Sequence, residues 1–203
     1  MTRIPKTEIT GVKGALVKRV AKKMLGEVPE PLGVMWHHQG VLAATMGLGR
    51  KANKWNECDK DLKSYAHMAV ASLVGCSFCL DMGYFQARNE GLDLVKAREI
   101  PRWRESEVFT PLERDVLTYA EAMSQTPPTV TDELSGRLLK RLGAPALLEL
   151  TAFVAAANLA ARMNVALGIE AQGFATSCGL PPLAQPRTQS MPQAGSSGTP
   201  SRA

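Results

Sequence analysis

The segment from Pro145 to Leu167 constrains the fold more than any other part of the sequence. Pro145 suits the first turn of a helix, and apolar residues then occupy nearly every side of that helix: Leu147, Leu148, Leu150, Phe153, Val154, Leu159 and Val165. A helix without a polar face is buried in a soluble protein, either in the core or between subunits. The sequence therefore predicts one helix that other helices or subunits surround.

Helix signals recur along the chain, whereas convincing alternating patterns of β-branched residues are missing. Thr110, Pro111 and Glu113 combine an N-cap, a first-turn proline and a capping-box glutamate. Only 5% of the residues are aromatic, so Ala, Leu, Val and Met must build most of the core, which favours close helix packing. We predict an all-α fold, with helices over 9–24, 31–51, 62–74, 77–90, 92–98, 111–124, 131–142 and 145–167.

Composition divides the chain into three parts. Residues 1–29 form an N-terminal amphipathic arm with a basic face, residues 30–178 a helical domain, and residues 179–203 a Pro/Ser/Gly-rich tail expected to be disordered. The basic face is expected to be solvated, with binding to a membrane surface as the alternative.

Charge and hydropathy point away from several classes of partner. The net charge of +5 is too small to indicate a nucleic-acid partner. The N-terminus lacks the pattern of a signal peptide, and no run approaches the roughly 18 apolar residues of a membrane span. We expect a soluble cytoplasmic protein that binds neither nucleic acid nor membrane.

Two cysteines, Cys76 and Cys79, lie three residues apart at the predicted start of a helix. This spacing allows a disulfide with little backbone motion. The unpaired N–H groups and the dipole of a helix N-terminus favour a thiolate over a thiol. A thiolate can attack a peroxide or a disulfide, and the second thiol can then resolve the product. The pair therefore predicts two-electron redox chemistry.

Other roles for these cysteines are also considered. A structural zinc ion needs four ligands, and the only nearby candidates, Cys58 and His67, match no familiar spacing, so we expect no metal. The helical flanks argue against a thioredoxin fold. Both cysteines could instead be small core residues, as is expected for the isolated Cys58 and Cys178.

The residues from Leu62 to Gly91, with Gly-Cys-Ser-Phe-Cys-Leu-Asp-Met at their centre, resemble the alkylhydroperoxidase D-like proteins of the carboxymuconolactone decarboxylase family. Two later stretches, 109–121 and 147–168, resemble further segments of that family, the second including Asn158, Arg162, Asn164 and Gly168. The resemblance covers about residues 30–178.

This resemblance implies an all-α domain that assembles into trimers or hexamers, with the active site near a subunit contact. It implies reduction of a peroxide or a disulfide by the two cysteines, with Cys79 attacking the peroxide and Cys76 forming the disulfide with it. No nucleotide-binding glycine motif follows a predicted strand, so we expect no cofactor. The electron donor would be an unidentified thiol protein or a small thiol.

The chain departs from the peroxidase members at both positions of their proton relay. Ser64 replaces a glutamate twelve residues before the first cysteine, and Gly83 replaces a histidine four residues after the second. His67 lies on the same helical face as Ser64 and is the candidate base, against a structural role. His37 and His38 are expected to be structural or solvated. Asp81 is expected to stabilise the helix dipole from the first turn.

Two other functions stay open. The family takes its name from a cofactor-free decarboxylase of a lactone, which does not use redox cysteines. The pair could also serve a non-enzymatic redox-sensing or structural oligomer, because the usual relay is missing. The leading prediction is a thiol peroxidase or disulfide oxidoreductase whose activity is weak without that relay.

Overall fold

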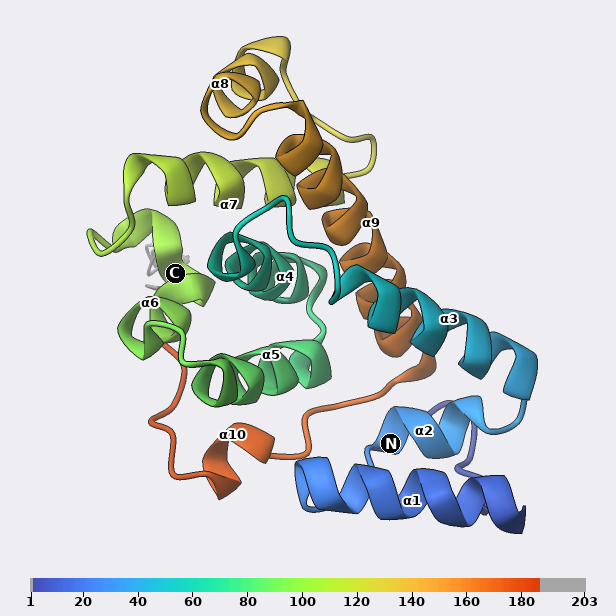
Figure 1. Cartoon of the computed structure of the whole chain (residues 1–203). Helices are drawn as coiled ribbons and strands as arrows, with labels where there is room; N and C mark the ends of the chain where they lie inside the picture. Colours follow the sequence, from blue (N-terminus) through green and yellow to red (C-terminus); the bar gives the residue numbers. More distant parts are fainter. Residues whose placement is uncertain (1, 187–203) are drawn as a thin grey trace, which may run out of the picture.

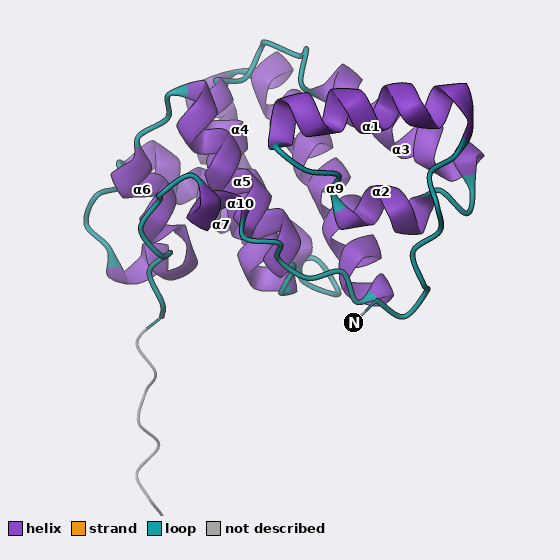
Figure 2. Ribbon diagram, turned by 90° about the horizontal axis from the view of Figure 1, so that it is seen from below, coloured by secondary structure: helices purple, strands orange, loops and turns teal. Residues whose placement is uncertain are grey.

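The computed structural model of the protein describes residues 2–186, and the described residues form helices and no strand (Figures 1 and 2). The predicted all-α fold is confirmed. The helices are α1 Gly11–Leu25, α2 Glu30–Met35, α3 Gln39–Ala52, α4 Lys60–Val74, α5 Ser77–Glu90, α6 Leu94–Glu99, the 3-10 helix η1 Ile100–Glu105, α7 Pro111–Ser124, α8 Asp132–Leu142, α9 Ala144–Leu167 and α10 Phe174–Ser177.

Helix α4 lies at the centre of the fold and packs against α5, α7 and α9 (Figure 1). The Asp59 carboxylate begins the helix by accepting hydrogen bonds from the Asp61 and Leu62 backbone N–H groups. Gly75 ends it in the left-handed conformation, with φ of 78°. Tyr65 and Met68 are fully buried between these ends, so α4 is a rigid base for its neighbours.

Helix α9 places one face in the core and leaves another exposed in the single chain. Leu150, Val154 and Ala161 are buried at helical spacing, whereas Leu148 is 71% and Leu159 46% exposed. By length and composition α9 could cross a membrane, but core helices of soluble proteins meet the same criterion. Its contacts with α4, α7 and α8 place one face of α9 in the core, as predicted, and burial of the other face by a subunit stays a prediction.

The prediction of one helix over 31–51 is wrong, because α2 and α3 are separate. His38 leaves the helical conformation, with φ of −138°, and its Nδ1 accepts a hydrogen bond from the Val41 N–H to begin α3. His37 Nε2 lies 2.8 Å from the Pro5 carbonyl oxygen. Both histidines are therefore structural, as expected, and together they make the turn between the two helices.

Helix α1 forms as predicted, but it presents its expected apolar stripe to solvent. Gly14 is the buried residue of this helix, and Val17 and Ala21 are partly buried against a small cluster formed by Ile9, Leu32 and Leu42. The exposed apolar residues are Val12, Leu16, Val20 and Met24. Helix α1 packs against this cluster through Gly14 and not through its large apolar residues, because glycine permits a closer approach of the helix to its neighbours.

The C-terminal segment returns across α5 and is fixed there by Asp81. This carboxylate is buried and accepts hydrogen bonds from the backbone N–H groups of residues 173, 174 and 175, at 2.8, 3.0 and 2.9 Å. The expected first-turn role of Asp81 is therefore wrong, since it lies beyond the first turn of α5 and begins α10 instead.

The start of the predicted disordered tail is packed against α6. The Ala184 N–H donates to the Arg98 carbonyl oxygen, Arg98 Nε donates to the Pro182 carbonyl oxygen, and Ala184 is buried. The prediction of disorder from Gly179 onward is therefore wrong for the start of the tail. Composition could not reveal these contacts, because they depend on burial and hydrogen bonds against α6. Residues 187–203 of that tail lie outside the described residues.

Candidate functional site

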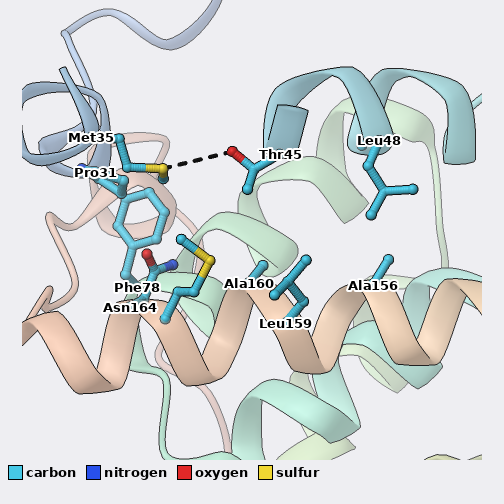
Figure 3. A pocket seen from close by; sticks show the side chains of 11 residues that line it. Pro31, Met35, Thr45, Leu48, Phe78, Ala156, Leu159, Ala160 and Asn164 are labelled. Atoms are coloured by element: carbon cyan, nitrogen blue, oxygen red, sulfur yellow. Dashed lines mark hydrogen bonds between the residues drawn. The ribbon is translucent and has the colours of Figure 1, made fainter. Parts of the chain in front are cut away.

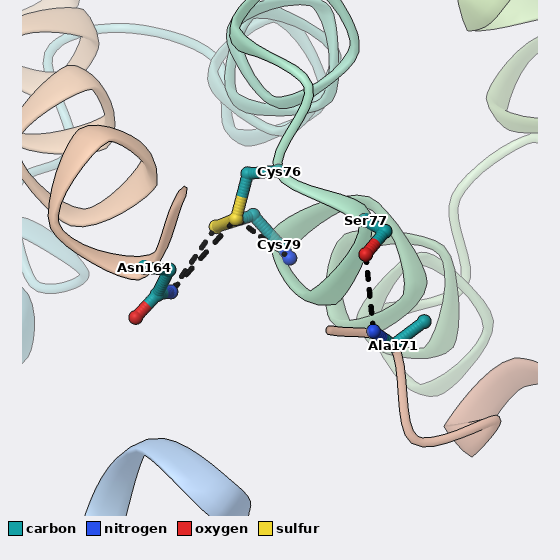
Figure 4. Close-up of a disulfide and its surroundings, with 5 residues drawn as sticks. All are labelled: Cys76, Ser77, Cys79, Asn164 and Ala171. Atoms are coloured by element: carbon teal, nitrogen blue, oxygen red, sulfur yellow. Dashed lines mark hydrogen bonds between the residues drawn. A yellow bond between two sulfur atoms is a disulfide. The ribbon is translucent and has the colours of Figure 1, made fainter. Parts of the chain in front are cut away.

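Cys76 and Cys79 lie where α4 ends and α5 begins, and a disulfide joins them (Figure 4). Their Cα atoms are 5.3 Å apart. Cys76 is the N-cap of α5, and its Sγ lies 3.2 Å from the Cys79 backbone N–H that donates to it. Both residues are buried: Cys76 is 1% exposed and Cys79 is 5% exposed. The predicted position at a helix N-terminus is therefore observed.

Asn164 is the other polar group beside the sulfur atoms. Its Nδ2 lies 3.4 Å from Cys79 Sγ and 3.8 Å from Cys76 Sγ, and the residue comes from the last turn of α9 (Figure 4). Sequence reasoning noted Asn164 within the family resemblance but gave it no role. Nothing in the local sequence could have paired it with cysteines 85 and 88 residues away.

His67 and Gly83 face each other between α4 and α5. A Cβ atom built on Gly83 would lie 3.4 Å from His67 Nδ1 and 2.9 Å from Met68 Cγ. His67, Ser64 and Gly83 also line one cavity of about 320 Å³, together with Gln86. The structure thus places the His67 ring beside Gly83, which lies one helical turn after Cys79.

The environment of His67 keeps its imidazole neutral. Burial lowers the pKa of the ring below its usual 6.5, since the protonated form loses hydration. Neither ring nitrogen has a hydrogen-bond partner among the described residues. A neutral imidazole with a free nitrogen can accept a proton near neutral pH.

An apolar pocket of about 230 Å³ lies between α2, α3 and α9, with Phe78 of α5 in its wall (Figure 3). Asn164 is its main polar wall residue near the sulfur atoms, and Phe78 comes from the turn between the two cysteines. The lining residues are Pro31, Met35, Thr45, Leu48, Gly49, Phe78, Ala156, Leu159, Ala160, Met163 and Asn164. Sequence reasoning missed this pocket because α2, α3 and α9 meet only in the folded chain.

The two remaining cysteines lie outside this site. Cys58 is buried, and this burial raises the pKa of its thiol to about 11, which makes it a poor nucleophile at neutral pH. Cys178 is partly buried and packs against the core. Within residues 2–186, no group of three or more His, Cys, Asp or Glu side chains is arranged to hold a metal ion.

Comparisons with known proteins agree with this geometry. Residues 39–122, which include both cysteines of the disulfide, match the model of the carboxymuconolactone decarboxylase family. The uncharacterized protein YnjA of Escherichia coli K12 is 38% identical over 130 residues, which are 64% of this chain and 71% of that protein.

Two solved structures share the fold at lower identity. A variant of the debrominase Bmp8, in complex with 2,3,4-tribromopyrrole, superposes with a TM-score of 0.74 at 19% identity, over 87% of this chain and 97% of that one. The alkylhydroperoxidase AhpD core protein from Ralstonia eutropha JMP134, which is peroxidase-related and uncharacterized, also gives 0.74 at 17% identity, over 85% and 94%. With its helical fold and its two-cysteine motif, this chain belongs to the carboxymuconolactone decarboxylase family.

Proposed function

We propose that the protein is a thiol-dependent oxidoreductase that reduces a peroxide or a disulfide with Cys76 and Cys79. The observation that carries this proposal is the sulfur pair at the N-terminus of α5, close enough to bond and flanked by a pocket. Backbone N–H groups and the helix dipole at this position favour the thiolate that such chemistry needs.

With a peroxide, the reaction proceeds in three balanced steps. The Cys79 thiolate attacks one peroxide oxygen, the O–O bond breaks, and the leaving oxygen takes a proton to give an alcohol or water. The resulting sulfenic acid of Cys79 reacts with the Cys76 thiol, which forms the disulfide and releases water. Two thiol groups of an external reductant then restore both cysteines and become a disulfide themselves.

Substitution of each cysteine tests this proposal. Cys76→Ser and Cys79→Ser should each abolish turnover of a peroxide or a disulfide with dithiothreitol as the reductant. Cys58→Ser and Cys178→Ser are matched controls and should retain it. Mass spectrometry after mild peroxide treatment should detect the bond between Cys76 and Cys79. Turnover that persists in Cys79→Ser would contradict the proposal.

We assign the proton transfer to His67. Its position against Gly83, next to Ser64, and its lowered pKa support a base that is neutral at pH 7. His67→Gln should lower kcat/KM at pH 7 by about 100-fold, which is the lower end for loss of a general base. His38→Asn, which keeps an N-cap side chain, is the control and should leave the rate unchanged. An unchanged rate in His67→Gln would remove this histidine from the mechanism.

The apolar pocket is the proposed substrate pocket. Ala160 lines it, whereas Ala155 is exposed on the same helix and does not. Ala160→Phe should raise KM for cumene hydroperoxide several-fold and change KM for hydrogen peroxide less, because the larger substrate needs the filled volume. Ala155→Phe should change neither. Equal effects of both substitutions would contradict this assignment.

A second candidate reaction is reductive debromination. The apolar pocket beside the sulfur atoms suits a brominated ring, and the similarly folded Bmp8 is a debrominase observed with 2,3,4-tribromopyrrole. In that reaction two thiols become a disulfide while carbon–bromine cleavage yields bromide and a C–H bond. Release of bromide from tribromopyrrole, together with loss of two thiols, would favour this candidate over peroxide reduction.

Two further functions make different predictions. A cofactor-free lactone decarboxylase would retain its activity after substitution of both Cys76 and Cys79. A non-enzymatic redox switch would change its oligomer size between the reduced and the oxidised protein, without turnover. Light scattering on both redox forms, with the peroxidase assay beside it, separates these functions from the proposed one.

We also propose a homo-oligomer, a trimer or a hexamer. The exposed apolar residues of α1 and α9 support this proposal, since Val12 is 90%, Leu16 62% and Leu148 71% exposed in the single chain. Leu16→Glu should reduce the mass measured by light scattering. Val95→Glu replaces an exposed apolar residue on α6 and is the matched control. A monomeric wild-type protein would contradict the proposal.

A further inference from the structure

We propose that Asn164 is a catalytic residue that stabilises the Cys79 thiolate, while the backbone of α5 stabilises the Cys76 thiolate. This inference rests on the proposed thiol chemistry and adds a residue to it.

The two sulfur atoms have different hydrogen-bond donors. Cys76 Sγ lies 3.2 Å from the backbone nitrogen of Cys79, at the N-cap position where the α5 dipole is strongest. Cys79 Sγ lies 3.4 Å from Asn164 Nδ2, which is 3.8 Å from Cys76 Sγ. Sulfur is large, and 3.4 Å is a hydrogen-bond distance for it, so the amide favours Cys79.

The position of Asn164 is fixed by the end of α9. Its backbone carbonyl oxygen accepts hydrogen bonds from Gly168, which has the left-handed conformation, and from Ile169. The side chain is 6% exposed, so its amide cannot turn outward to bulk water without loss of this packing. A buried amide needs a partner, and the sulfur atoms are the side-chain partners that Asn164 has among the described residues.

The Asn164 amide can donate a hydrogen bond to Cys79 Sγ in both the oxidised and the reduced cysteine pair. In the disulfide, the Asn164 N–H makes a weak bond to a neutral sulfur. After reduction, the same N–H faces a thiolate, and a hydrogen bond to a charged acceptor is stronger. The stabilisation is therefore larger for the ionised Cys79 than for the disulfide or the thiol. Asn164 does not titrate, so it cannot replace the base, and it acts by charge stabilisation alone.

Asn164 also lines the apolar pocket, whereas neither cysteine does. A molecule in that pocket therefore meets the polar edge of Asn164 next to Cys79 Sγ. This arrangement selects Cys79 as the sulfur atom that reacts with the substrate and leaves Cys76 to resolve the product. The same order follows from the family resemblance, and Asn164 provides its physical reason in this chain.

Single-cysteine proteins test the inference, and they are made in a background with Cys58→Ser and Cys178→Ser, which removes the two free thiols. In Cys76→Ser, the alkylation rate by iodoacetamide as a function of pH gives the pKa of Cys79; in Cys79→Ser, it gives the pKa of Cys76. Adding Asn164→Leu, which has a similar size and no donor, should raise the pKa of Cys79 by about one unit, a tenfold loss of thiolate at pH values below the pKa. The pKa of Cys76 should rise by much less.

Two further variants separate the donor from effects of packing. Asn164→Asp keeps the shape and offers only acceptor atoms, so it should raise the pKa of Cys79 at least as much as Asn164→Leu does. Asn158→Leu removes an amide on the same helix that donates to Ser124 Oγ, and it should leave both thiol pKa values unchanged. Circular dichroism checks the helical content of each variant, and Asn164→Asp provides the test if Asn164→Leu does not fold.

Equal shifts of both cysteines, or no shift in Cys79, would overturn the inference. These outcomes are independent of turnover. Wild-type protein that reduces neither a peroxide nor a disulfide would refute the proposed function, and the thiol titration would still show whether Asn164 stabilises the Cys79 thiolate.

Discussion

Asp81 provides the sharpest test of how the C-terminal segment is held against the thiol helix. Its carboxylate accepts three backbone hydrogen bonds, from residues 173, 174 and 175, at 2.8 to 3.0 Å. Asp81→Asn keeps the size of the side chain, removes the charge and replaces one oxygen by an amino group. That amino group would face backbone N–H groups, which are donors themselves.

The magnitude follows from these contacts. A hydrogen bond to a charged group contributes about 1.5–3 kcal/mol to stability, and Asn can retain part of the set through its remaining oxygen. We expect a loss of about 2–4 kcal/mol in the stability of the segment. Phe174 packs against Phe78 and Phe85, with ring centroids 6.2 and 6.0 Å apart, so this apolar contact still opposes detachment.

Two measurements separate local from global effects. Urea unfolding reports the free energy of the whole fold, and hydrogen exchange of a peptide over 171–185 reports opening of this segment alone. Asp93→Asn is the control, because Asp93 caps α6 and Asn is an equally good N-cap. Stability within 0.5 kcal/mol of wild type, with unchanged exchange over 171–185, would refute the assigned role of Asp81.

Three other predictions concern buried ionisable groups. Glu149→Gln leaves the Lys63 ammonium buried without its partner at 2.6 Å, and urea unfolding should show a loss of about 3–5 kcal/mol, smaller when Lys63→Met is added. Because burial lowers the pKa of His67 in the folded protein, the unfolded protein binds a proton at this residue at a higher pH than the folded protein does. The free energy of unfolding should therefore fall as the pH drops below about 6.5, and it should fall less steeply in His67→Gln. Cys58, with its pKa raised to about 11, should resist iodoacetamide at pH 7.5 until urea unfolds the protein. Fast alkylation of Cys58 in the folded protein would contradict the reasoning for this thiol, as would a pH profile identical in His67→Gln for the histidine and an unchanged stability of Glu149→Gln for the ion pair.

The elements with strong local signals could be predicted from the sequence. The capping box of Thr110 and Glu113 begins α7, and Gly75 and Gly91 end α4 and α5 in the left-handed conformation, because these signals act within one helical turn. The same locality placed Cys76 at a helix start.

Features that depend on tertiary contacts could not be predicted in the same way. The turn between α2 and α3 depends on His37, whose partner, the Pro5 carbonyl oxygen, lies 32 residues away. Asp81 has an ordinary helical sequence context, and its backbone partners lie more than 90 residues later. Asn164 is one amide in an apolar helix, and only the packing of α9 across the start of α5 brings it to the sulfur atoms.

Ser64 and Gly83 stand in the sequence as two separate losses from the family's relay, but the structure connects them. A side chain at position 83 would place its Cβ 2.9 Å from Met68 Cγ, closer than real Cβ contacts, and 3.4 Å from His67 Nδ1. The His67 ring can therefore lie at this point because residue 83 has no side chain. A histidine added at 83 would have to displace Met68, which is fully buried, so restoring one family residue would disturb the core. The absence of a side chain at Gly83 and the position of the His67 ring are thus one structural arrangement, in which an imidazole of α4 occupies the space beside residue 83 of α5.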